Sequence, residues 1–173
     1  MQGPTHLVTG VLIQRVIKKV RPLPLRYFLV AFLAITSHGI LDRLARFTYH
    51  PPMPLTEDGF WISYHLIIAF MSISIFVKYW GKYKCGLIFS ILPDLDWVVL
   101  HSSNFFSFQI PVWKEAILHG FFFSFLDSLL LFRFLNTLPD WSLERKGAIL
   151  ELALFLTLII LSYRWQYTWR ERT

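Results

Sequence analysis

The feature that most constrains this chain is a succession of apolar runs, each long enough for a helix and separated from the next by a mostly short connection. Six runs can be traced along the 173 residues, at about 6–17, 27–41, 60–77, 86–100, 112–135 and 148–163. The first is short and partly amphipathic, which fits an interfacial helix or a short inserted one. The pattern predicts an all-α fold, a polytopic integral membrane bundle of about five to six short helices, forming a single domain over residues 1–173.

The composition agrees with lipid as the solvent. The chain is 55% hydrophobic, contains 17 Phe and is only 16% charged. A soluble domain of this size could not hide so much apolar surface from water. Its net charge of +6 comes from basic residues that fall between the apolar runs. That placement is typical of membrane flanks rather than of the basic stripe of a nucleic-acid binder. We therefore expect membrane lipid as a partner and no nucleic acid.

The basic residues also predict an orientation if all six runs cross the membrane. One side would carry ten of them and the other six, and the richer side is expected to be cytoplasmic. The ten are Lys18, Lys19, Arg21, Arg26, Lys78, Lys82, Lys84, Arg133, Arg145 and Lys146, and the six are Arg43, Arg46, Lys114, Arg164, Arg170 and Arg172. The predicted location is an integral membrane, the inner or cytoplasmic membrane if the protein is bacterial.

Ionisable residues inside or at the ends of the apolar runs are the main functional signal. With alternating crossings, eight of them fall in one leaflet, opposite the Lys-rich loops: His6, His38, Asp42, His65, Asp94, Asp96, His101 and His119. Only Asp127, Arg133 and Glu151 fall in the other half. Such groups are costly in lipid, so they are expected to face the bundle interior and to pair with one another or with an ion. Imidazoles and carboxylates at one depth form a plausible ligand set for Zn²⁺ or a similar divalent ion.

Two local patterns sharpen this prediction. His38 and Asp42 are four residues apart, so in a helix they project from one face and can share a metal, or the carboxylate can orient the imidazole. The alternative is a helix-end histidine paired with a carboxylate. Asp94 and Asp96 follow Pro93, which weakens a helix, and a broken helix could turn both carboxylates toward one site. The alternative there is an aspartate that caps a new helix.

Four motifs together resemble the predicted membrane-bound metal-dependent hydrolases of the YdjM-like family. They are Thr5-His6, Ser37-His38 with Asp42, Leu92-Pro93-Asp94-Leu95-Asp96, and Leu118-His119-Gly120. The resemblance implies a small α-helical membrane bundle and metal-assisted hydrolysis, with His6, His38, Asp42, Asp94, Asp96 and His119 as metal ligands or catalytic groups. The chain departs from the family pattern at three points. Trp97 stands where the LPDxDH-like motif ends in His, Lys114 and Glu115 replace an earlier His and Arg, and the motif order is altered.

The leading hypothesis from the sequence is a membrane-embedded metal-dependent hydrolase. Its substrate would be a lipid-like amphiphilic small molecule carrying an ester or phosphoester, and its cofactor a divalent metal, with zinc as the expected ion. His38, Asp42, Asp94 and His119 are the first choices for ligands, His6 is a further one, and Asp96 and His101 are the candidate catalytic residues. One alternative is a non-catalytic membrane protein, or a subunit of an oligomer or larger complex, with a structural metal or His–Asp cluster. Another is a proton or ion pathway, which would need polar residues in both leaflets.

Overall fold

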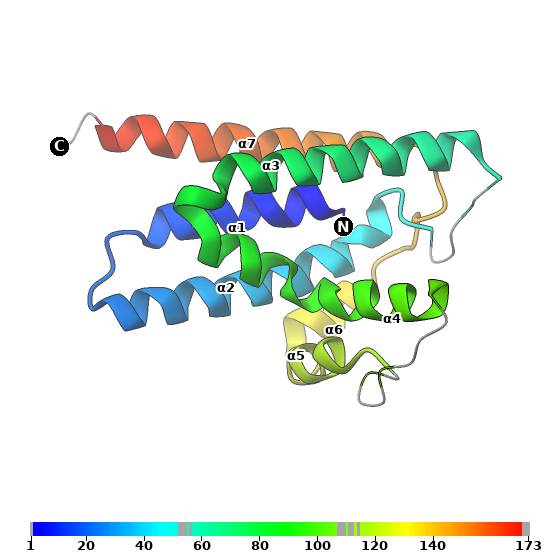
Figure 1. Ribbon diagram of the computed structural model, residues 1–173, viewed down its shortest axis with the longest axis horizontal. Helices are drawn as coiled ribbons and strands as arrows, with labels where there is room; N and C mark the ends of the chain where they lie inside the picture. Colours follow the sequence, from blue (N-terminus) through cyan, green and yellow to red (C-terminus); the bar gives the residue numbers. More distant parts are fainter. Residues whose placement is uncertain are drawn as a thin grey trace.

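The computed structural model describes residues 2–51, 55, 57–106, 110, 113 and 115–170 (Figure 1). Every regular element in these residues is a helix, so the all-α prediction is confirmed. The elements in chain order are α1 (Gly3–Ile17), α2 (Leu23–Leu44), η1 (Ala45–Phe47), α3 (Gly59–Ile91), η2 (Leu92–Asp94), α4 (Leu95–Phe105), α5 (Ile117–Asp127), α6 (Leu130–Asn136) and α7 (Gly147–Arg170).

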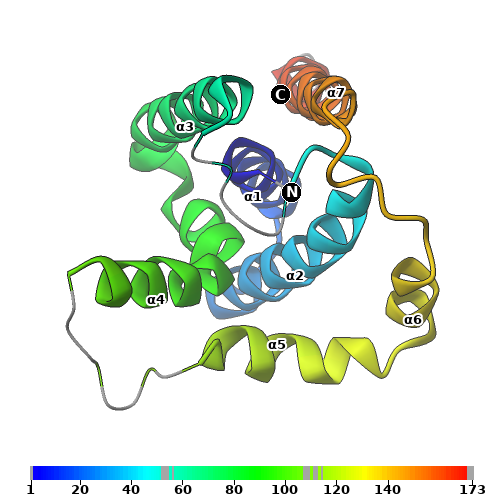
Figure 2. The ribbon, with the colours of Figure 1, turned by 90° about the vertical axis from the view of Figure 1, so that its right-hand side faces the viewer.

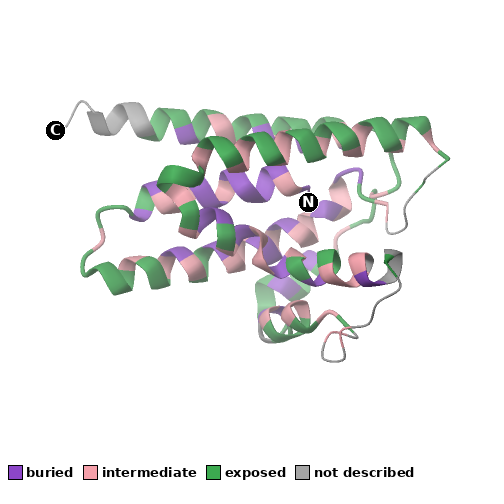
Figure 3. Ribbon diagram, in the orientation of Figure 1, coloured by how far each residue is buried: buried purple, intermediate pink, exposed green. Residues whose placement is uncertain are grey.

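Three stretches are long and apolar enough to cross a membrane: Leu23–Phe47, Gly59–Leu100 and Gly147–Trp165. Large apolar side chains along α3 and α7 remain exposed, as in Phe70 (73%), Val77 (70%) and Ile149 (70%). Water would penalise this surface, whereas lipid would not. Figure 3 shows the same division, with exposed positions along the outside of α3 and α7 and buried ones on α1.

The third and fourth apolar runs form one chain of helices with a bend. Tyr83 has non-helical backbone angles (φ −130°, ψ 31°) inside α3, and the helix changes direction there (Figure 1). A second break follows at η2, where Pro93 lies in a short 3₁₀ turn before α4 begins at Leu95. The predicted break of the helix at Pro93 is therefore observed. The nitrogen of proline carries no hydrogen and cannot donate a hydrogen bond to the preceding turn.

The first apolar run, α1, occupies the centre of the bundle. Viewed end-on, it is surrounded by α2, α3 and α7 (Figure 2). Leu7 and Val11 pack against Leu87 of α3, and all three are nearly inaccessible. Gly10 and Gly86 let the two backbones meet, since a Cβ added at either would lie 2.2 Å from the carbonyl oxygen of the other. Small residues at crossings of this kind are typical of helices packed in membranes. An inserted position therefore stays the prediction for this helix, which at 15 residues is shorter than the three candidate spans.

The fifth apolar run corrects the assumption that all six runs cross. Leu129 adopts an extended conformation and separates two short helices, α5 and α6, neither of which reaches the length needed for a crossing. As a result, α7 runs back toward the turn between α1 and α2 (Figure 1). Arg164 near the end of α7 therefore lies at the same end as Lys18 and Arg21. Arg145 and Lys146, just before α7, lie at the opposite end.

Candidate metal centre

Four side chains from three parts of the fold converge beside α1. His38 and Asp42 project from one face of α2, Asp94 comes from η2, and His119 comes from the first turns of α5. One potential ligand atom from each of the four lies within 4.8 Å of all the others. We call these four residues the His–Asp group. His38 is completely buried, whereas the side chain of Asp94 is 38% exposed and gives the group an open side.

His38 provides the most informative geometry. Its Nδ1 lies 2.6 Å from the backbone carbonyl oxygen of Ser90, a distance at which Nδ1 must donate a proton to that oxygen. In the neutral ring, Nε2 then has a lone pair and no proton. This lone pair faces two carboxylates, with Asp42 Oδ2 at 3.0 Å and Asp94 Oδ1 at 3.4 Å.

A lone pair facing two carboxylates is repulsive unless a positive charge lies between them. Either a second proton on His38 or a cation would supply that charge. The buried Nε2 makes no aligned hydrogen bond within the described residues, although both oxygens are near. A divalent cation could therefore take the place of the second proton between Nε2 and the two carboxylates. Nitrogen and carboxylate oxygen are also the donor types that bind divalent transition metals, and a histidine bonded to a backbone carbonyl through its other nitrogen is the usual arrangement at such sites.

Asp96 lies next to the His–Asp group but has a different environment. Its carboxylate is fully buried and accepts hydrogen bonds from the Trp113 indole (2.7 Å) and from the backbone N–H of His119 (2.7 Å). The carboxylate therefore holds the N-terminal turn of α5, where an anion is favourable. Asp94 is the N-cap residue of α4, yet its side chain makes no capping bond and faces His38 instead. The break at η2 thus turns both carboxylates toward the same region, and only Asp94 belongs to the His–Asp group.

His119 sits between these two environments. Its Nε2 lies 3.8 Å from Asp42 Oδ2, and its Nδ1 lies 3.5 Å from Asp96 Oδ2. The Trp97 indole N–H, at the position where the resembled motif has a histidine, donates to His119 Nε2 over 3.4 Å. At that length the bond is weak. It uses the same nitrogen that faces Asp42.

His6 lies beside the His–Asp group rather than within it. Its ring stacks on His38, with centroids 4.0 Å apart, and its Nε2 lies 3.1 Å from Asp42 Oδ1. Asp42 is thereby approached through one oxygen by His6 and through the other by His38. Since His6 is only 1% exposed, it fixes the direction of the Asp42 carboxylate from inside the bundle.

The other candidates from the sequence either lie outside the His–Asp group or have side chains that are not among the described residues. The backbone of His101 lies in α4, and its side chain falls outside the described residues, as does Lys114. His65 bonds the Trp61 carbonyl of its own helix at 2.8 Å and is not part of the His–Asp group. Two groups that contact the site were not predicted from the sequence. They are the Ser90 carbonyl, which bonds His38, and the Trp113 indole, which bonds Asp96. Thr5, which could have capped α1, instead donates to Glu151 of α7 at 2.5 Å.

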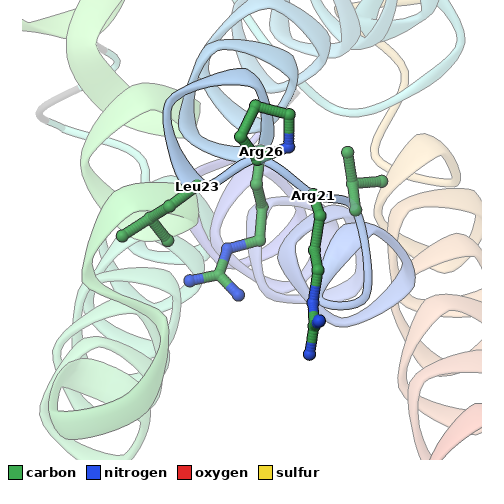
Figure 4. A pocket seen from close by; sticks show the side chains of 5 residues that line it. Arg21, Leu23 and Arg26 are labelled. Atoms are coloured by element: carbon green, nitrogen blue, oxygen red, sulfur yellow. The ribbon is translucent and has the colours of Figure 1, made fainter.

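Two of the concavities among the described residues differ in character and in their distance from the His–Asp group along the chain. An apolar groove of about 510 Å³ is bordered by α1, α3 and α4 and includes Asp94 in its lining. A hollow of about 620 Å³ lies at the turn between α1 and α2, where Arg21 and Arg26 extend beside Leu23 (Figure 4). No acid or histidine lines this second hollow, so it is not a metal site.

No protein-family model, curated protein or solved structure matches this chain.

Proposed function

We propose that the protein is an integral membrane metalloenzyme that hydrolyses an ester or phosphoester of a lipid-like amphiphile. In this proposal His38, Asp42, Asp94 and His119 bind one divalent ion, with zinc as the expected metal. Membership of the metal-dependent hydrolase family that the motifs resemble is part of the same proposal. The supporting observation is His38, whose Nδ1 is committed to the Ser90 carbonyl while its Nε2 faces two carboxylates.

The proposed hydrolysis gives separate roles to the bound metal, to Asp94 and to Asp96. Zinc held by the His–Asp group would lower the pKa of a water molecule and would polarise the oxygen of the scissile ester. The exposed side of the site belongs to Asp94, so substrate and water would arrive there. Water would add to the acyl or phosphoryl centre and the bond to the ester oxygen would break. One proton of the water would pass to the departing alcohol, and the acid product would keep the hydroxyl group. Asp96 acts as a positioning residue, because it holds the turn that presents His119.

The distribution of basic residues supports an orientation in which the turn between α1 and α2 is on the cytoplasmic side. The turn between α1 and α2 and the C-terminal end of α7 lie at the same end of the bundle (Figure 1). These segments carry Lys18, Arg21 and Arg164, and an excess of basic residues is typical of the cytoplasmic side. We place the protein in the inner or cytoplasmic membrane if it is bacterial. The metal site then lies in the leaflet opposite the end that carries Lys18 and Arg21. Substrate would then reach the site from the non-cytoplasmic leaflet.

The proposal is tested with the purified protein in mixed micelles. Zinc content is measured by mass spectrometry, and hydrolysis is followed with p-nitrophenyl esters and with phospholipids. The wild type should contain one zinc per chain and release product. His38→Ala should lose both properties, while His65→Ala should keep both, since His65 lies outside the His–Asp group. Equal zinc content and equal turnover in wild type and His38→Ala would refute the proposal.

A second candidate function is a structural metal or His–Asp cluster without catalysis. One contact favours it: the Trp97 indole bonds His119 Nε2 at the position where the resembled motif has a histidine. A closed site should bind zinc and gain stability from it, yet release no product from any ester. Stoichiometric zinc without turnover would therefore favour this second function over the first.

A further inference from the structure

An apolar groove that includes Asp94 lies next to the His–Asp group. It runs between α1, α3 and α4, and we call it the Asp94 groove. Its volume of about 510 Å³ is within the usual range of small-molecule sites. Leu7 forms part of its floor and is 3% exposed. Asp94 is the one charged residue in its lining, and Asp94 Oδ1 lies 3.4 Å from His38 Nε2.

The rim of the Asp94 groove faces the surface that we assign to lipid. Ile73 on α3 is 65% exposed, and Val98 on α4 is 59% exposed. Both side chains line the groove. A molecule could therefore enter sideways from the bilayer with its hydrocarbon part leading, without crossing water.

A second groove, which is also lined by residues of α3, provides a comparison. It lies between α1, α3 and α7, has a volume of about 280 Å³ and is also mainly apolar. Ile67 lines it and is 58% exposed. Its charged residue is Glu151, which bonds Thr5, and no member of the His–Asp group lines it. Of the two lipid-facing grooves, only the Asp94 groove leads to the candidate metal centre.

We propose that the Asp94 groove binds the hydrocarbon chain of the substrate, so that the ester next to this chain comes to lie at Asp94. This inference rests on the proposed function and narrows it to substrates with a linear acyl chain. Chain-length preference is then set by the groove, whereas the hydrolysed bond is set by the His–Asp group. The groove between α3 and α7 holds bilayer lipid and has no part in selecting substrate.

The first test locates a photoreactive palmitic acid on the intact protein in mixed micelles. After illumination, labelled peptides are identified by mass spectrometry in wild type, Ile73→Trp and Ile67→Trp. Labels on α1, α3 and α4 around the Asp94 groove should dominate in wild type. They should disappear in Ile73→Trp and persist in Ile67→Trp. The two substitutions are matched, because both add an indole at an exposed position of α3 beside an apolar groove. Labels found mainly outside the Asp94 groove, or labels at the groove that persist in Ile73→Trp, would overturn the inference.

The second test separates this inference from the proposed function. Hydrolysis of p-nitrophenyl butyrate, octanoate and palmitate is compared among the same three proteins. Ile73→Trp should lower the ratio of palmitate to butyrate hydrolysis by about tenfold, the lower end for a steric misfit in an apolar pocket. Ile67→Trp should leave the ratio unchanged. Hydrolysis that needs His38 but shows the same chain-length ratio in all three proteins refutes the groove inference alone. Labelling of the groove without hydrolysis of any ester refutes the proposed function alone.

Discussion

Two neighbouring contacts of α1 differ in what holds them together. At Gly10 the helix meets Gly86 of α3, and the two backbones fit because neither residue has a side chain. At His6, about one turn earlier, the helix meets the buried imidazole of His38 and the carboxylate of Asp42. The Gly10–Gly86 contact is complete within the protein. The contact at His6 brings together nitrogen lone pairs and carboxylates that a cation would stabilise.

This difference indicates which part of the molecule specifies the fold and which part is available for chemistry. Substitutions at the glycine contact should affect folding whether or not metal is present. Substitutions in the His–Asp group should affect metal binding and leave the metal-free fold nearly intact. Four experiments test this division.

The largest effect is expected for Gly86→Leu. A side chain at this position would meet the backbone of Gly10 at 2.2 Å, and a backbone cannot move aside as a flexible side chain can. We expect the free energy of unfolding to fall by about 3 kcal/mol or more, as for severe overpacking. Thermal unfolding in detergent measures this, with and without zinc. Gly81→Leu is the control, because a Cβ there meets nothing within 4 Å. Equal stability of the two variants would contradict the role of the contact.

His38→Ala should remove stabilisation by metal rather than stability itself. At a zinc concentration 100-fold above Kd, binding to the folded state adds about 2.7 kcal/mol. Wild type should gain this amount, and His38→Ala should gain nothing. The measurement is the shift in Tm on adding zinc, with a chelator as the reference condition. A zinc-dependent shift of equal size in His38→Ala would show that the ion binds elsewhere.

Asp96→Asn should weaken metal binding without abolishing it. The amide keeps one acceptor oxygen, but it loses the charge that holds the turn around His119. Loss of such a supporting carboxylate typically lowers metal affinity by about 10- to 100-fold. Competition with a chelating dye gives the affinity. Asp127→Asn is the control, since Asp127 also loses a charge but pairs with Arg43 and is not a member of the His–Asp group. A purely structural Asp96 would lower the apo protein's Tm and leave the zinc affinity unchanged.

The smallest effect is expected for Trp97→Phe. The substitution removes the indole N–H that donates to His119 Nε2 over 3.4 Å and so frees this nitrogen for an ion. Losing one competing hydrogen bond should raise zinc affinity by about tenfold at most. The same dye competition measures it. Weaker zinc binding in Trp97→Phe than in wild type would mean that the indole supports the site instead of competing with it.

Much of the fold and of the His–Asp group could be predicted from local sequence patterns. The spacing of His38 and Asp42 places both on one face of α2, and Pro93 breaks the helix before Asp94. These predictions depend on the periodicity of a helix and on the missing N–H of proline, which are local properties. The structure adds that one potential ligand atom from each of the four residues lies within 4.8 Å of the others.

Other features could not be read from local patterns. The first helix has only 15 residues, and local patterns do not show that α2, α3 and α7 surround it, so its sequence fits an interfacial position as well as an inserted one. The break at Leu129 has neither proline nor glycine, so the fifth run was expected to cross as one helix. The Ser90 carbonyl is a backbone group, and only the tertiary structure shows that it bonds His38.

The most direct test of the central claim is anomalous X-ray diffraction at the zinc edge from crystals grown with zinc. We expect one strong peak among His38, Asp42, Asp94 and His119, with zinc–nitrogen distances of about 2.0–2.1 Å. His38 should ligate through Nε2 while its Nδ1 remains bonded to the Ser90 carbonyl. A protein that shows no peak at these residues, or a peak only at other residues, would contradict the account.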